Sequence, residues 1–245
     1  TNWSTVASGS LITSAVIGGL TNGVPVTVRV KARNATGLGP DATVSGTPAV
    51  GSAPGAPTAL TATPGDAQVS LAWTAPVNSG GTAIAGYRIE RSLDAGMNWT
   101  VVSSNTGSSI TTYLVTGLAN GTAVSFRVSA INGAGSGAVT TTVTATPRTV
   151  PGAPGVPTAI AASGSIALSW SAPSLDGGAP ILDYTVERST DGVNWTAVTT
   201  LTGTTTTVTG LVNGTAYSFR IRARNIAGQS AASIVVTSTP AALPG

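Results

Sequence analysis

The sequence predicts an all-β chain of tandem sandwiches, each made of two sheets and seven short strands. Three observations predict this fold class. Groups of residues recur in a fixed order, apolar and polar residues alternate within them, and 31 Gly and 15 Pro are distributed along the 245 residues. Alternation with period two is typical of strands with one buried face, and Gly and Pro mark the turns between strands.

Four groups of residues recur three times in the same order, which indicates an internal repeat. They are an Asn-Trp pair, a Gly-Leu-x-Asn-Gly turn, a segment that begins with Arg and ends with Asn, and a closing Thr-Pro pair. They lie at Asn2-Trp3, Asn98-Trp99 and Asn194-Trp195; at Gly19–Gly23, Gly117–Gly121 and Gly210–Gly214; at Arg29–Asn34, Arg127–Asn132 and Arg220–Asn225; and at Thr47-Pro48, Thr146-Pro147 and Thr239-Pro240. Trp73 and Trp170, each followed three residues later by Pro, occur in only two of the units.

The first unit therefore corresponds to only the second half of a repeat. We predict that residues 1–49 are the C-terminal half of a repeat and that residues 50–149 and 150–245 are complete repeats. Joints rich in Pro and Gly, Pro48–Pro57 and Pro147–Pro157, separate the units. Such spacers are short and semi-rigid, so we expect an extended string of domains rather than one globule. We expect both ends of the sequence to be cuts within a longer array.

Within the second unit, seven strands are expected between clusters of turn residues. In one of them Val69, Leu71 and Trp73 alternate with small or polar residues, which places the three apolar side chains on one face. The expected strands lie at Leu60, Val69–Trp73, Tyr87–Ile89, Trp99–Val102, Tyr113–Leu118, Val124–Ala130 and Val139–Val143. Seven short strands in about ninety residues predict two antiparallel sheets packed face to face.

These residues resemble the fibronectin type III family, whose repeats are immunoglobulin-like sandwiches and are common in secreted or cell-surface bacterial proteins. The resemblance covers the whole chain, with the first repeat truncated to its C-terminal half. It is carried by Trp73 and Trp170 with the Ala-Pro pairs after them, by Tyr87 and Tyr184, by the Asn-Gly-Thr turns that follow Leu118 and Leu211, and by Phe126–Asn132 and Phe219–Asn225. It implies the fold and leaves the function open, because this sandwich serves many functions.

One departure from the family concerns a Tyr early in the sixth strand. In the family, its hydroxyl forms a hydrogen bond back to the main chain at the corner before that strand. Tyr217 occupies this position in the third unit, whereas Val26 and Val124 replace it in the other two. We therefore expect the second repeat to lack a buried hydrogen bond worth roughly 1 kcal/mol.

Composition argues against catalysis. The chain has no His and no Cys, which removes the commonest general base, thiol nucleophiles, disulfides and thiolate metal sites. We predict a protein that is not an enzyme, with no catalytic residue, cofactor or metal. Charged residues make up 8%, and 11 Lys and Arg against 8 Asp and Glu give a net charge of +3 spread over the whole length, so no nucleic-acid partner is expected. No apolar stretch reaches the roughly 18 residues of a membrane span, so no membrane insertion of this fragment is expected.

Two sets of polar residues are read as turn formers. Asp176, Asp183 and Asp191 lie at or between loops of the third repeat, and turn capping explains them better than calcium, which needs several converging oxygen ligands. Six Asn-x-Ser/Thr triplets would be glycan acceptors in a eukaryotic secretory pathway, but they occur where turns favour Asn and Gly. They begin at Asn2, Asn34, Asn98, Asn120, Asn194 and Asn213.

Two further sets leave a binding role open. Basic residues line one face of the sixth strand, at Arg29, Lys31 and Arg33 in the first unit and at Arg220, Arg222 and Arg224 in the third, while the second keeps only Arg127. They could bind an anionic cell-wall polymer or glycan, but pairing with Glu90 or Glu187 on the neighbouring strand is favoured. Trp99 and Trp195 could stack on sugars, but packing against the side of the sandwich is the preferred interpretation.

We predict a non-catalytic extracellular or cell-surface protein, for which the sequence identifies no ligand-binding residue. The first hypothesis is a spacer, stalk or adhesion repeat array, whose partners are other protein chains or a cell-surface polymer. The second is a structural subunit of a self-assembling surface filament or virion appendage. In that case self-association occurs through residues 1–49, whose open sheet edge a neighbouring chain completes. The third is an accessory glycan-binding module of a secreted hydrolase, which requires an exposed aromatic platform.

Overall fold

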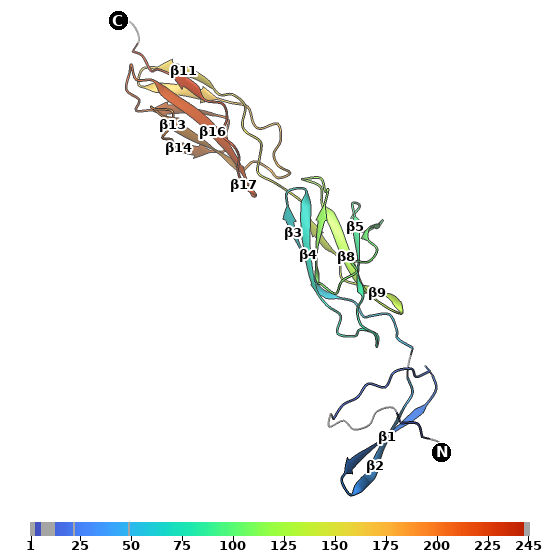
Figure 1. Cartoon of the computed structure of the whole chain (residues 1–245). Coiled ribbons are helices and arrows are strands. Elements are labelled where there is room, and N and C mark those ends of the chain that lie inside the picture. Colours follow the sequence, from blue (N-terminus) through green and yellow to red (C-terminus); the bar gives the residue numbers. More distant parts are fainter. Residues whose placement is uncertain (1–2, 6–12, 22, 49, 243–245) are drawn as a thin grey trace.

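The computed structural model describes residues 3–5, 13–21, 23–48 and 50–242, and these form 18 strands. Among these residues there is no helix with the length and apolar character that a membrane span requires. A hairpin and two sandwiches follow one another along an elongated chain, each with its own sheets (Figure 1). The predicted all-β fold class is confirmed. Asn2 and Asn22, which belong to the first copies of two recurring groups, lie outside the described residues.

The second repeat consists of two antiparallel sheets. One has the strand order β3-β4-β7, and the other has the order β10-β8-β5-β6 with β9 also paired to β8. The strands are β3 (Thr58–Gly65), β4 (Gln68–Thr74), β5 (Gly86–Ser92), β6 (Thr100–Ser103), β7 (Thr112–Thr116), β8 (Val124–Asn132), β9 (Gly135–Val139) and β10 (Val143–Ala145).

The third repeat has the same topology. Its sheets have the orders β11-β12-β15 and β14-β13-β16-β17, with β18 also paired to β16. The strands are β11 (Thr158–Ala162), β12 (Ser165–Ser169), β13 (Asp183–Ser189), β14 (Thr196–Leu201), β15 (Thr205–Thr209), β16 (Tyr217–Asn225), β17 (Gly228–Gln229) and β18 (Val236–Ser238).

The predicted inward faces form the cores. Val69, Leu71 and Trp73 of β4 are buried, and so are the alternate residues of β8 on the facing sheet. Trp73 packs edge-on against Tyr87, with ring centroids 4.9 Å apart, and Trp170 packs in the same way against Tyr184 at 5.7 Å. Aromatic pairs prefer such edge-to-face arrangements. The period-two alternation therefore identified the buried face correctly.

The prediction of one continuous last strand at Val139–Val143 is wrong, because this strand is divided into β9 and β10. At the break, Thr140 donates its N–H to the Val128 carbonyl at 2.8 Å, and its hydroxyl accepts the Val128 N–H at 3.2 Å. In the third repeat, Ser230 and Ser233 accept main-chain N–H groups of β16 in the same way. A side-chain hydroxyl thus accepts the hydrogen bond in place of a main-chain carbonyl. The strand pairing can therefore be interrupted without leaving a buried N–H group unpaired.

The described strands of the first unit form a hairpin of β1 (Val26–Asn34) and β2 (Gly37–Gly46). Its turn repeats that of the third repeat: the Asn34 side-chain oxygen accepts the Thr36 and Gly37 N–H groups, as Asn225 does at the end of β16. The inward positions differ in exposure. Val30 is 65% exposed, whereas Val128 and Ile221, at the same place in the recurring segment, are 0% exposed.

The expected corner hydrogen bond is present in the third repeat. The Tyr217 hydroxyl accepts the N–H of Val212 at 3.2 Å, and the Tyr ring is buried. Val124 occupies the same position in β8 and is also buried, which leaves the second repeat with packing but no hydroxyl at this corner.

We predict that Tyr217→Phe lowers the free energy of unfolding of the third repeat by about 1 kcal/mol, because it removes this bond and keeps the ring. Hydrogen exchange followed by mass spectrometry reports the two repeats separately and measures the change. The second repeat, which has Val124, is the internal control. Equal changes in both repeats, or none in the third, would contradict the prediction.

Candidate functional site

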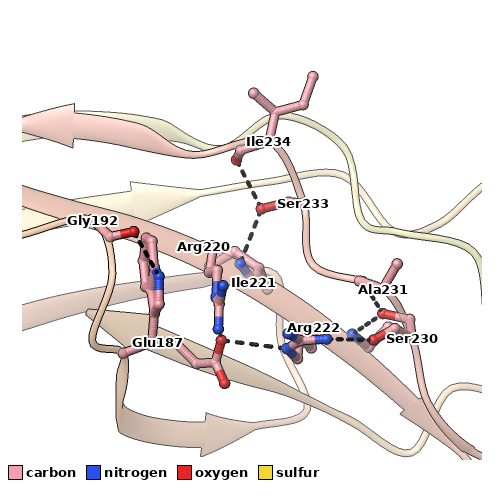
Figure 2. A network of polar contacts seen from close by, with 11 residues as sticks. Glu187, Gly192, Arg220, Ile221, Arg222, Ser230, Ala231, Ser233 and Ile234 are labelled. Carbon is pink, nitrogen blue, oxygen red and sulfur yellow. Dashed lines mark hydrogen bonds and ion pairs between the residues drawn. The ribbon is translucent and has the colours of Figure 1, made fainter. Parts of the chain in front are cut away.

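The outer face of the sheet formed by β13 and β16 carries a cluster of paired charges. Glu187 of β13 lies opposite Arg220 of β16 in the strand register, and its carboxylate accepts a hydrogen bond from the Arg220 guanidinium. The same carboxylate oxygen accepts a bond from Arg222 at 3.3 Å, and Arg222 also donates to the Ser230 carbonyl at 3.0 Å (Figure 2). One carboxylate therefore serves two of the predicted ladder residues.

The second repeat has a similar cluster around Glu90 of β5, but one of its two arginines comes from β5 itself. The two oxygens of Glu90 accept hydrogen bonds from Arg88 at 2.9 Å and from Arg127 at 2.7 Å. The Glu90 side chain is only 9% exposed. Burial opposes its ionisation, but the hydrogen bonds and charges of Arg127 and Arg88 outweigh that cost and lower the pKa of Glu90. The preferred interpretation, pairing with the neighbouring strand, describes Arg127 of β8, whereas Arg88 lies on β5 itself, two residues from Glu90.

In the first unit the pairing takes place within the hairpin. Arg29 and Lys31 of β1 lie 3.7 and 3.9 Å from the Asp41 carboxylate on β2. Arg33 forms no ion pair with any residue in the described ranges. Two cations thus share one carboxylate within this hairpin, whereas in each complete repeat the acid lies on the neighbouring strand, β5 or β13.

Each recurring Trp is covered by an arginine of this face. The guanidinium carbons of Arg29, Arg127 and Arg220 all lie 4.2 Å from the centroid of a Trp ring, those of Trp3, Trp99 and Trp195 respectively. The Trp195 indole also donates its N–H to the Gly192 carbonyl at 3.3 Å. Arg127 and Arg220 therefore lie between an aromatic ring and a carboxylate, an attractive position for a cation. One face of each ring is occupied, which supports the packing interpretation over a sugar platform.

The three acids of the third repeat do not act alike. Asp176 accepts the Gly178 N–H at 2.8 Å, and Asp191 accepts the N–H groups of Val193 and Asn194, so both cap turns as expected. The hydrogen bond from the Asn194 side chain, together with these main-chain bonds and the bond from the Ser189 hydroxyl, holds the pKa of Asp191 well below its usual range.

The expectation of a turn cap is wrong for Asp183. It is the first residue of β13, and its carboxylate accepts hydrogen bonds from the guanidinium of Arg224 on β16; these bonds raise the pKa of Arg224. The sequence placed Asp183 near a loop, and this placement did not show that it faces an arginine on the neighbouring strand. Within the part of the chain that the structure describes, no three acidic groups converge as metal ligands would.

The side chains of four triplet asparagines are engaged in turns. The amide nitrogens of Asn98, Asn120 and Asn194 donate to aspartates at 2.6, 2.8 and 2.7 Å, and that of Asn213 donates to a Ser163 hydroxyl at 3.2 Å. Asn34 uses its oxygen to cap its own turn. A glycan would attach to the same nitrogen, so these bonds favour the turn-forming role. The sixth triplet asparagine, Asn2, lies outside the described residues.

Sequence reasoning missed the contact between arginine and tryptophan, although its signal was present. The Asn-Trp pair and the Arg-initiated segment recur together in all three units. That common recurrence could have indicated that the two residues meet in the fold. What it could not give is the order of the stack, which depends on how β14 and β16 lie on either side of β13.

We predict that Arg220→Met lowers the free energy of unfolding of the third repeat by about 1–2 kcal/mol, because it removes the contacts to both Trp195 and Glu187. Chemical denaturation followed by Trp fluorescence measures the loss. Arg224→Met is the matched control: Arg224 is 51% exposed against 23% for Arg220, so we expect a smaller loss there. Equal losses for the two variants would show that the stack adds nothing.

Comparison with known proteins places this geometry in a family. The family described as "Fibronectin type III domain" matches residues 55–146 and 152–239. The chain is 35% identical over 213 residues to Chitinase A1 of Niallia circulans, across 80% of this chain and 28% of that protein. It is 33% identical over 214 residues to Exoglucanase B of Cellulomonas fimi, across 81% of this chain and 18% of that protein.

A third relative is not named as an enzyme. The chain is 32% identical over 226 residues to human Myomesin-2, across 87% of this chain and 15% of that protein. The chain therefore spans less than a third of the length of each of these relatives. The two family matches together cover more than half of the chain, with the paired aromatic cores and the corner turn inside them. This chain belongs to the fibronectin type III family.

Proposed function

We propose that this chain is a non-catalytic extracellular spacer, which holds other domains of a longer protein apart on or near a cell surface. The observation that supports this most directly is the arrangement of closed sandwiches in series (Figure 1). Each complete repeat has its own core, and the carboxylates on its outer face are paired with arginines of the same sheet. An outer face whose carboxylates are already paired within the sheet suits a domain that separates its neighbours rather than one that recognises a ligand.

The relatives support a modular role. Chitinase A1 and Exoglucanase B are named as enzymes, but the match covers 28% and 18% of them, so most of each protein lies outside it. Myomesin-2 is not named as an enzyme, although its matched part is of similar length. A module that occurs in proteins with such different names is expected to add geometry rather than chemistry.

We predict that this chain can substitute for the matched part of Chitinase A1 without loss of chitin hydrolysis. A Gly/Ser linker with the same number of residues is the control, because it is flexible and its ends lie closer together on average. Release of sugar from insoluble chitin is measured, with a soluble substrate as the reference. The spacer proposal fails if the Gly/Ser linker serves equally well.

The accessory glycan-binding hypothesis makes a different prediction for the same material. It requires the isolated chain to be retained on insoluble chitin or cellulose, and Trp195→Ala to abolish that retention. We expect no retention, because Arg220 already occupies one face of the ring. Retention that depends on Trp195 would replace the spacer by a binding module.

Self-assembly through the first unit is a second candidate function, favoured by one observation. Val30 and Val44 on the β1–β2 hairpin are 65% and 67% exposed, although the equivalent of Val30 is buried in both complete repeats. We propose that residues 1–49 are the second half of a repeat, whose inner face is completed by further strands. An open edge with an apolar face is a template for strand addition.

If no second copy of the chain completes this hairpin, we predict that light scattering shows a monomer and that limited proteolysis cleaves residues 1–49 first. A dimer or polymer in which residues 1–49 resist the protease would show completion between chains. Val30→Asp then separates the two cases, because a charge on the inner face would dissolve such an assembly and leave a monomer unchanged.

A further inference from the structure

The segment between the second and third repeats is bonded to both of them, residue by residue. The Pro147 carbonyl accepts the Gly121 N–H at 2.9 Å, and the Arg148 N–H donates to the Gly65 carbonyl at 2.9 Å, so both residues are held by the second repeat. The next residue, Thr149, donates its N–H to the Gly177 carbonyl of the third repeat at 2.8 Å. Consecutive residues are therefore anchored on different repeats, and no free residue is left between them to act as a hinge.

Asn225, at the end of β16, holds the same segment from the other side. Its amide nitrogen donates to the Thr149 carbonyl at 2.8 Å and to the Asp176 carbonyl at 2.7 Å. Its oxygen accepts the N–H groups of Ala227 and Gly228 at 2.8 and 3.2 Å. The residue is 2% exposed, and both donors and its acceptor are used. Such a buried, fully satisfied amide is costly to disturb.

The same attachment recurs at the entry to the second repeat. There the Asn132 amide nitrogen donates to the Ser52 and Ser79 carbonyls, both at 2.7 Å, and the Ser52 N–H donates to the Gly80 carbonyl at 2.8 Å. Both complete repeats therefore hold the preceding linker in the same way, through the Asn that ends the sixth strand and a Gly of the loop after the second strand.

The two repeats also approach each other closely at a pair of glycines. A Cβ on Gly178 of the third repeat would lie 2.3 Å from the Gly121 nitrogen of the second, closer than atoms can pack. Gly81 has the same place in the second repeat, but a Cβ there would meet no described residue within 4 Å. The backbone is the same at both positions, with φ of +82° at Gly178 and +84° at Gly81. Gly178 is therefore restricted by the neighbouring repeat as well as by its own turn.

We propose that the second and third repeats form one rigid body, in which the turn at Asn120-Gly121 docks on the loop at Asp176–Gly178 and Asn225 locks the segment between them. Relative motion of neighbouring domains is the usual expectation for small interfaces, so this joint departs from it. The inference deepens the proposed spacer function, because a fixed angle sets the reach of the array. It depends on the joint alone and not on what the array carries.

The test uses two spin labels in the full chain, whose lack of Cys makes Thr116→Cys and Thr209→Cys the only attachment sites. These exposed residues lie at equivalent ends of β7 and β15. Pulsed electron spin resonance measures the distribution of distances between them. We expect one narrow distribution. A broad distribution in the unaltered joint would overturn the proposal.

Two matched pairs of variants then locate the rigidity. Gly178→Ala and Gly81→Ala impose the same backbone strain, but only the first collides with the other repeat, so only the first should shift or broaden the distribution. Asn225→Ala should broaden it, whereas Asn132→Ala removes the equivalent bonds at the other joint and should leave it narrow. Equal responses within either pair would contradict the proposal. A narrow distribution together with failure in the chitinase exchange would retain the rigid joint and remove the spacer function.

Discussion

Burial of the inner face of each sheet against the other is the constraint on which the rest of this structure depends. In each complete repeat the buried side chains of both sheets form one cluster, with a Trp packed edge-on against a Tyr. Because the chain has no Cys, apolar burial holds these small domains together without disulfides. The β1–β2 hairpin shows the alternative. Its strands carry the same alternation without an opposing sheet among the described residues, and Val30 remains exposed.

Burial of one face of each sheet determines which residues lie on the outer face. Residues that alternate with the core on β8 and β16 must point outward, and in this chain several are arginines. Glu90 and Glu187 lie beside them on the adjacent strand, and Trp99 and Trp195 cover them. The resulting stack uses the charges on each sheet to stabilise that sheet. Since charged residues make up only 8% of the chain, few charges remain for the rest of the surface.

The joints between repeats also use residues of the repeats themselves. The Asn that ends the sixth strand caps its own turn and also clamps the incoming linker, so folding of a repeat positions the segment before it. A string of such repeats has an angle defined by hydrogen bonds and close contacts rather than by linker stiffness alone. Family membership does not define this angle, because the linking segment at residues 147–151 lies outside the two matched ranges.

The sequence by itself determined the fold class, the strand faces and the turn role of Asp176 and Asp191, because alternation and turn chemistry are local signals. The pairing of Arg220 with Glu187 was also predictable, since neighbouring strands bring outward residues together. Only the tertiary structure decided the break at Thr140, the partner of Asp183 and the clamp at the joint. Each depends on a partner outside the residue's own strand or turn: Thr140 meets Val128 12 positions away, Asp183 meets Arg224 41 positions away, and Asn225 meets Thr149 76 positions away. Contacts of this kind leave no local sequence pattern, so the residues can be read from the sequence but their contacts cannot be predicted from it.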